Sequence, residues 1–290
     1  MAIQNKYVWN AITGRQHVQN FGSVWQDHWL MSQGPAARLD RLAFELFQPR
    51  NLLCQIDHPS LHQQRKEDGG NHSSVLSRAV VLREECSKWT QALPYRWRSI
   101  PVRRDEVNQS VKVAGIYGIT CDVYANLSIA NTRNWHRIIG FGALQVLNTR
   151  FQASTQHPGS NFPSGELQNV IPQIQLMVDE ICASVPYCAG DITKPTSPVL
   201  EDIVRFPFVH LDLPGISEPR TFPKSIAQHE VQVASSGARL MHRILTSTAK
   251  MMEGDYVHTT LVCNHKRGWI KSQILRLSSV LHPTLKLRDA

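Results

Sequence analysis

The sequence predicts an all-α protein, an irregular domain of about seven helices interrupted by one long proline-rich loop. Three observations lead to this fold class. Apolar residues recur every three or four positions in several long segments, which is the period of an amphipathic helix. No run alternates apolar and polar residues for long enough to predict a strand. With 290 residues, 42% of them hydrophobic, the chain has enough apolar material for a substantial core.

Residues 36–55 form the first predicted helix, because Pro35 suits a first helical turn and apolar residues share one side behind it. Pro49 is expected to break this helix, since proline lacks the backbone N–H that a helix interior requires. The segment 1–35 is expected to be partly ordered, and residues 36–290 form the predicted helical domain. The apolar side of the first helix consists of Leu39, Leu42, Ala43, Leu46 and Phe47.

A second helix is predicted to end at Pro94. Ser73 or Ser74 can cap its beginning, and the polar residues 60–74 predict a loop before it. Its apolar residues recur at alternating spacings of three and four, which places them on one face: Ala79, Leu82, Cys86, Trp89 and Leu93.

Further helices are predicted from Tyr124 onward and again after residue 164. In the later one, Ser164 is a plausible cap and Gly190 a plausible stop, while Pro172 predicts a kink or a later beginning. Its apolar stripe consists of Leu167, Val170, Ile171, Ile174, Met177, Ile181, Cys182 and Val185. Six prolines between residues 191 and 225 predict the long extended loop. The last stripe, ended by Pro283, consists of Ile270, Ile274, Leu277 and Leu281.

The charge of the chain lies mainly in its two flanks. Lysine and arginine total 31 against 23 acids, a net charge of +8, and residues 113–200 are nearly neutral. Basic residues can contact phosphates, although solvated helix faces are the commoner use of such positions. The densest run is Arg96, Arg98, Arg103 and Arg104. A second scatter comprises Lys266, Arg267, Lys271, Arg276, Lys286 and Arg288.

Common catalytic, metal and targeting signatures fail on inspection. The six cysteines form no C-x-x-C pair, so buried free thiols are predicted in place of a zinc site. Gly140 and Gly142 begin like a dinucleotide loop but lack its third glycine, which favours close helix packing. His58 and His62 flank a proline, and Trp25 and Trp29 suit packing better than ligand binding. The sequence therefore predicts no catalytic residue, no metal and no cofactor. It also predicts neither a secretion signal nor a membrane span.

Five segments in order carry a family resemblance. Residues 38–46 read RLDRLAFEL, 89–97 WTQALPYRW, 123–130 VYANLSIA, 179–187 DEICASVPY and 267–274 RGWIKSQI. Together they resemble the regulatory region of fungal zinc-cluster transcription factors, the class with a binuclear six-cysteine finger. The motif residues expected to serve in packing are Trp89, Pro94, Trp97, Asn134, Arg137, Asp179, Pro186 and Trp269. Asn134 and Arg137 are expected to bond to backbone groups or a carboxylate, and Pro186 is expected to end its helix.

The resemblance implies a non-enzymatic, helical regulatory domain over residues 36–290, acting in the nucleus through protein partners or self-association. Many such regulators control secondary-metabolite gene clusters. The six-cysteine finger is not in this chain, and Asn126 and Arg133 stand where relatives carry aspartate and tryptophan. DNA contact through the basic residues is open, but specific recognition by this chain alone is not expected. The alternative is an accessory protein or enzyme of a biosynthetic cluster, with a small-molecule pocket between helices.

Overall fold

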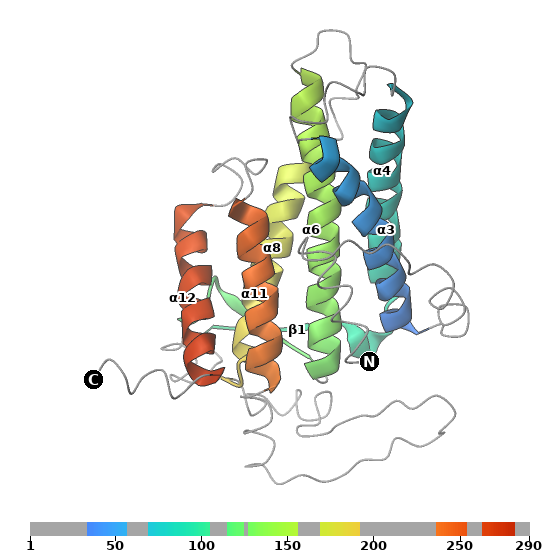
Figure 1. Cartoon of the computed structure of the whole chain (residues 1–290). Helices are drawn as coiled ribbons and strands as arrows, with labels where there is room; N and C mark the ends of the chain where they lie inside the picture. Colours follow the sequence, from blue (N-terminus) through green and yellow to red (C-terminus); the bar gives the residue numbers. More distant parts are fainter. Residues whose placement is uncertain are drawn as a thin grey trace. The chain divides into compact units, whose positions relative to one another are not determined.

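A computed structural model describes residues 34–56, 69–104, 115–124, 127–155, 169–191, 236–253 and 263–281, and 81% of this part is helical. The predicted mainly helical fold is confirmed (Figure 1). The tryptophans at 25 and 29, the histidines at 58 and 62 and the proline-rich loop lie outside these ranges. The described helices are α3 (Pro35–Ile56), α4 (Gly69–Gln91), α6 (Leu127–Thr155), α8 (Val170–Cys188), α11 (Ala238–Glu253) and α12 (Asn264–Leu281). Between α4 and α6 lie the 3-10 turn η2 (Tyr95–Trp97) and strands β1 (Ile100–Arg103) and β2 (Thr120–Val123).

The chain divides into two compact units. Unit 1 comprises Met1–Leu93, Trp135–Met177 and Glu253–Leu261, and unit 2 comprises Pro94–Asn134, Val178–Met252 and Val262–Ala290. The helices α6 and α8 each contribute residues to both units, whereas α4 belongs to unit 1 and α12 to unit 2. The candidate site described below is built from unit 1 residues alone.

In unit 1, α3 and α4 lie side by side and bury their apolar stripes (Figure 1). The indole Nε1 of Trp89 donates a 2.8 Å hydrogen bond to the backbone oxygen of Pro35, which ties the end of α4 to the beginning of α3. The predicted stripe of α4 is confirmed, because all of its members are buried: Ala79, Leu82, Cys86, Trp89 and Leu93. The buried residues of α3 are Leu39, Leu42, Ala43 and Leu46.

Two predicted helix boundaries in unit 1 are wrong. The helix α3 continues through position 49 to Ile56, although Pro49 was expected to break it. A proline removes one internal hydrogen bond, a loss that the burial of an apolar helix face can offset. The helix α4 begins at Gly69, so Ser73 and Ser74 lie inside the helix and do not cap it.

A two-stranded antiparallel sheet in unit 2 was not predicted. Ile100 pairs with Val123 and Arg103 with Thr120, and the backbone N–H of Arg104 donates to Ile119 at 2.8 Å. Each strand has four residues, which is too short for an alternating pattern to be recognised. Tertiary burial of the β2 side chains stabilises this short sheet.

The two ends of α8 are decided by backbone hydrogen bonding. The helix begins at Val170, so Pro172 lies in the first turn, where N–H groups have no helical acceptor; the predicted later beginning is confirmed. At the other end Gly190 has a φ of +80°, and the N–H of Asp191 bonds to the oxygen of Pro186 at 2.9 Å. This is the glycine stop that was predicted. The helix nevertheless runs past Pro186 to Cys188, so the expectation that Pro186 ends it is wrong.

Unit 2 contains a buried polar pair in its core and two ion pairs nearer its surface. The Ser184 hydroxyl donates to the oxygen of Ile181 at 2.7 Å and accepts a 2.9 Å bond from Asn134 Nδ2. Asn134 thus has a hydroxyl partner, a kind of partner that was not among those predicted. Arg276 on α12 forms two 2.9 Å bonds with the carboxylate of Asp191. A second pair joins Lys266 to Asp179 at 2.5 Å.

Candidate functional site

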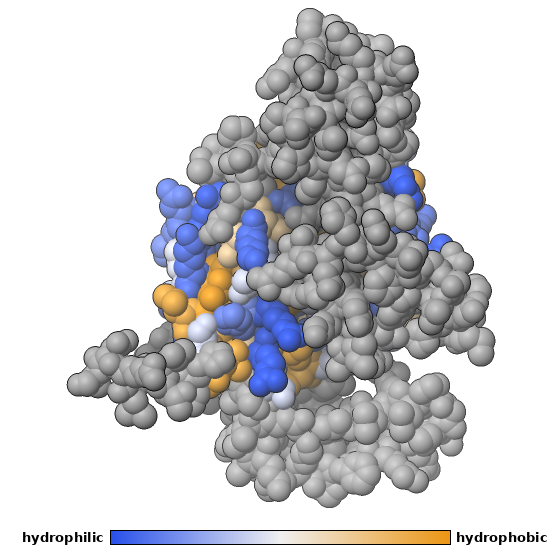
Figure 2. Space-filling view, viewed as in Figure 1, coloured by the Kyte–Doolittle hydropathy of each residue, from blue (hydrophilic) through white to orange (hydrophobic). Residues whose placement is uncertain are grey.

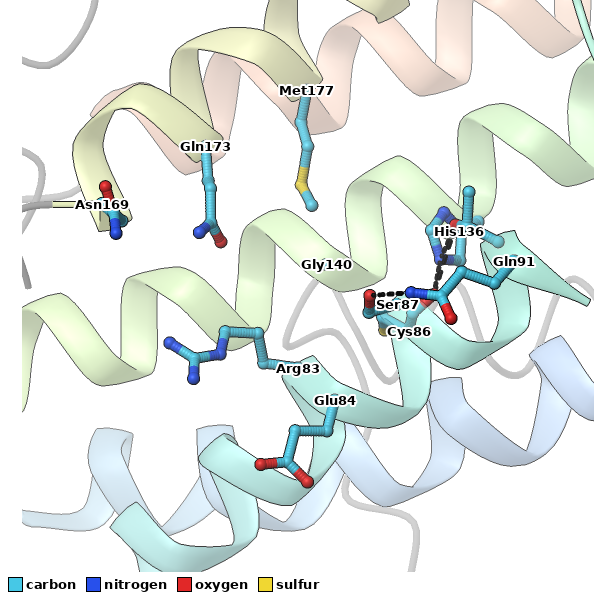
Figure 3. A pocket seen from close by; sticks show the side chains of 11 residues that line it. Arg83, Glu84, Cys86, Ser87, Gln91, His136, Gly140, Asn169, Gln173 and Met177 are labelled. Carbon is cyan, nitrogen blue, oxygen red and sulfur yellow. Dashed lines mark hydrogen bonds between the residues drawn. The ribbon is translucent and has the colours of Figure 1, made fainter. Parts of the chain in front are cut away.

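A groove in unit 1 is the candidate functional site (Figure 3). It has a volume of about 740 Å³, which lies in the range of small-molecule sites. Three helices line it, with α4 on one wall, α8 on the other and α6 between them. The lining residues are Arg83, Glu84, Cys86, Ser87, Thr90 and Gln91 from α4, His136 and Gly140 from α6, and Asn169, Gln173 and Met177 from the α8 side.

The α8 wall and the α4 wall carry different chemistry. Gln173 and Met177 point from α8 into the groove, which gives that wall an amide and a thioether (Figure 3). Arg83 extends from α4 along the opposite wall, near the amide-bearing end of the groove. The groove therefore offers amide groups with Arg83 and Glu84 at one end and, beyond the Met177 thioether, hydroxyl, amide and imidazole groups at the other. Such an arrangement fits a small molecule with a polar or anionic end.

His136 is held rigidly at the inner end of the groove. Its ring stacks on Trp89, with ring centres 4.4 Å apart and planes 15° from parallel. Its Nε2 lies 2.9 Å from the backbone oxygen of Cys86, and because a carbonyl only accepts, Nε2 carries a proton. Thr90 Oγ1 lies 3.3 Å from the same nitrogen. The stacking and these bonds fix the orientation of the imidazole before any ligand binds.

Gly140 lets α6 and α8 approach closely beside the groove. A Cβ at this position would lie 2.7 Å from the terminal carbon of Met177. A Cβ at Gly142 would likewise lie 2.8 Å from a methyl carbon of Leu46 on α3. The prediction that these two glycines serve close helix packing is confirmed. The side chain of Met177 can lie over Gly140 only because α6 presents no side chain there.

Two groups of the groove, the Cys86 thiol and Nε2 of His136, are held in unreactive states. Burial raises the pKa of the Cys86 thiol to about 12, and the carboxylates of Glu85 and Glu45 add to the rise. A thiol with this pKa is not a nucleophile near neutral pH. The Nε2–H of His136 is directed at a backbone oxygen, so this nitrogen is not available as a base.

The structure does not bring the predicted basic residues into this groove. Arg98, Arg103 and Arg104 are exposed in unit 2, around the short sheet, and the side chain of Arg96 lies outside the described part. Their exposure is compatible with a phosphate contact and equally with a solvated surface. Of the second scatter, Lys266 and Arg276 are engaged in ion pairs with aspartates.

The motif residues expected to serve in packing are distributed over both units. In unit 1, Trp89 and Arg137 are buried, and Trp89 contacts the groove residue His136. In unit 2, Asn134 and Pro186 are buried and Asp179 pairs with Lys266. Pro94 is exposed between α4 and η2, where Trp97 is half-buried. The Trp269 ring lies 5.3 Å from that of Tyr117.

Among the described cysteines, four are buried free thiols, as predicted: Cys86, Cys121, Cys182 and Cys188. Cys263 is exposed, contrary to that prediction. Backbone N–H groups at the beginning of α12 lower the pKa of Cys263. Within the described ranges, no group of three or more His, Cys, Asp and Glu side chains is arranged to hold a metal ion. None of the described helices is long and apolar enough to cross a membrane.

The groove was missed in the sequence although a signal for it existed. Arg83, Ser87 and Thr90 recur at helical spacing beside the apolar stripe of α4, which indicates a polar row at the edge of the buried face. That row does not reveal which helices face it. Asn169, Gln173 and Met177 also follow a four-residue spacing, but only the packing of α8 places them opposite α4.

A scan of the chain against models of protein families matched none of them. Searches of curated proteins and of solved structures found no match either.

Proposed function

We propose that this chain is a non-enzymatic regulatory module of a transcription regulator, and that the groove between α4, α6 and α8 binds a small effector. The sequence motifs supply the transcriptional part of the proposal, including action in the nucleus and control of a secondary-metabolite gene cluster. The groove is the structural observation on which the proposal of effector binding is based. Protein partners or self-association would transmit the response.

The form of the groove supports reversible binding. Its volume of about 740 Å³ suits a small molecule, and its polar groups come from three helices. The rigid stack of His136 on Trp89 gives a ligand a fixed surface at one end. The raised pKa of Cys86 and the engaged Nε2 of His136 favour binding over catalysis.

An effector in this position would act on the packing of three helices. A ligand that contacts both Arg83 on α4 and Gln173 on α8 favours the arrangement in which these walls are at the observed separation. Because α6 and α8 also contribute residues to unit 2, a change in their position is expected to reach the second unit. Regulation then follows from the differential affinity of the ligand for two arrangements.

The test is a tethering experiment with the full chain fused to a heterologous DNA-binding domain in a fungal reporter strain. We expect reporter output to change by about fivefold or more relative to the DNA-binding domain alone. Ser87→Phe, which fills the groove from α4, is expected to lock the output in one state. Ser77→Phe, the same change at an exposed position of α4 that does not line the groove, is the matched control. Reporter output equal to that of the DNA-binding domain alone contradicts the proposal.

The same groove keeps a second candidate, a ligand-handling accessory protein or enzyme of a biosynthetic cluster. The two are separated by combining the reporter with binding of the fluorescent probe anilinonaphthalene sulfonate. Loss of probe binding in Ser87→Phe together with locked reporter output supports the regulator. Loss of probe binding with a silent reporter in every variant supports the accessory protein.

A further inference from the structure

The two last helices of unit 2 carry a one-sided charge. The helix α11 contains three basic residues and α12 contains four, whereas Glu253 is the one acid in both sequences. The helices lie side by side, and His242 Nε2 on α11 is 2.9 Å from Ser278 Oγ on α12 (Figure 1). Hydrophilic residues gather over both helices on the face seen in Figure 2.

Some of these cations have structural roles and do not contribute to a binding surface. Lys266 is buried and pairs with Asp179, and Arg276 forms the two-bond contact with Asp191. The protein thus provides carboxylates for the cations that point inward. Besides Arg267 and Lys271 on α12, this leaves the three outward-facing cations of α11.

Three exposed cations form a single row on α11, namely Arg239, Arg243 and Lys250. They are four and seven positions apart, so at about 100° per residue they lie within about 40° of one another around the helix axis. The row is about 16 Å long at about 1.5 Å per residue. None of the three forms an ion pair within the part of the chain that the structure describes. We call these three residues the α11 row.

We propose that the α11 row binds the phosphate backbone of duplex DNA. Duplex DNA carries about one negative charge per 1.7 Å of its axis, so a straight row of about 16 Å lies along several phosphates. Arg239 and Arg243 lie one turn apart and Lys250 lies two turns further on, and the single acid of α11, Glu253, follows only at the end of the row. Contacts to phosphate oxygens carry no sequence information directly, so binding through the α11 row is expected to be independent of sequence. The choice of DNA as the polyanion rests on the proposed transcriptional function.

The test is fluorescence anisotropy of the full chain with a labelled duplex of about 20 base pairs at salt concentrations from about 50 to 200 mM. The triple variant Arg239→Gln, Arg243→Gln and Lys250→Gln is expected to reduce the slope of log affinity against log salt by about 3. Its affinity at low salt is expected to fall by at least about tenfold. The matched control, Arg38→Gln with Arg78→Gln and Lys88→Gln, removes the same charge from exposed positions of α3 and α4 and is expected to keep the wild-type slope.

Three results would overturn the inference. The first is absence of binding by the wild-type chain at about 50 mM salt. The second is an equal loss of DNA affinity in both triple variants, which would show that affinity depends on the net charge of the chain and not on the α11 row. The third is tighter binding, dependent on the α11 row, to polyglutamate or to vesicles with phosphatidylserine than to DNA, which would assign the row to an acidic protein or a membrane. In the reporter test the fused DNA-binding domain supplies the DNA contact. Failure of the α11 row to bind DNA would therefore leave the reporter result unchanged, so the two proposals can fail independently.

Discussion

Unit 1 places its buried His136 beside an open groove, whereas unit 2 places its buried Asn134 in a closed core. Around Asn134, the space bounded by Cys188, Gly237 and Met241 leaves no room for a water molecule. In unit 1 the polar groups of three helices converge on about 740 Å³ of open space. A buried polar group therefore serves two purposes in one chain, because a closed core uses it to specify packing and a groove uses it to shape a surface.

The difference has a practical consequence for mutagenesis. Substitutions in the closed core of unit 2 are expected to act on the free energy of unfolding. Substitutions along the groove of unit 1 are expected to act on ligand binding and to leave stability nearly unchanged. The following predictions test this contrast, beginning with the largest expected effect.

The largest effect concerns thiol reactivity. The pKa of Cys86 is raised to about 12 by burial, and that of Cys263 is lowered below its ordinary value of 9.0. At a given mildly alkaline pH the thiolate fraction of Cys263 therefore exceeds that of Cys86 on the order of a thousandfold. Iodoacetamide labelling followed by peptide mass spectrometry measures both rates.

The pH dependence of the same labelling has a definite sign. Because a lowered pKa means that the thiolate persists to lower pH, the rate at Cys263 is expected to reach half its maximum below the pH found for free cysteine. The unfolded chain in urea is the control, in which both cysteines should react alike. Rapid labelling of Cys86 in the folded chain would contradict the prediction, because it would show that the reagent reaches the Cys86 thiol from the groove.

The largest stability effect is expected for Gly237→Ala. A Cβ at this position would overlap the backbone oxygen of Cys188, which cannot move without disturbing the end of α8. We expect a loss of about 3 kcal/mol in the free energy of unfolding, measured with urea. Gly140→Ala meets only the flexible end of Met177, so its expected cost is below about 1 kcal/mol. Equal losses in the free energy of unfolding for the two variants would contradict the expected difference between the closed core of unit 2 and the groove of unit 1.

Asn134→Ala tests the polar pair of unit 2. The substitution leaves the buried Ser184 hydroxyl without the donor now at 2.9 Å, and we expect a loss of about 2 kcal/mol. The double variant with Ser184→Ala is expected to cost less than the sum of the single changes, since the two residues share one bond. Thr90→Val, at the groove, is the comparison and is expected to cost about 0.5 kcal/mol. Full additivity would contradict the pairing.

The smallest effect concerns the ion pair between α12 and the end of α8. Asp191→Asn weakens the two 2.9 Å bonds of Arg276, a partly buried pair, and is expected to cost about 1 kcal/mol. Glu85→Gln removes the exposed pair with Lys88 on α4 and is expected to cost about 0.3 kcal/mol or less. At about 1 M salt the cost of Glu85→Gln should decrease by a larger fraction than that of Asp191→Asn, because the exposed pair is screened more strongly.

Local patterns were sufficient to predict much of the helical structure. The 3-4 spacing from Ala79 to Leu93 predicted the buried face of α4, and Gly190 predicted the end of α8. Prolines were less reliable, because position 49 and Pro186 both lie within helices. A helix can accommodate the loss of one hydrogen bond when its apolar face is buried elsewhere, and the sequence around a proline does not reveal that compensation.

The sequence by itself determined the helical class and the apolar faces of the main helices, because both depend on residue spacing along a single helix. It also carried the five segments whose resemblance to transcription regulators supports the proposed function. Only the tertiary structure decided that α4, α6 and α8 enclose a groove and that Asn134 bonds to Ser184. It likewise separated the ion-paired cations Lys266 and Arg276 from the exposed α11 row. These outcomes depend on which helix faces which, and contacts between residues 50 or more positions apart leave no periodic trace in the sequence.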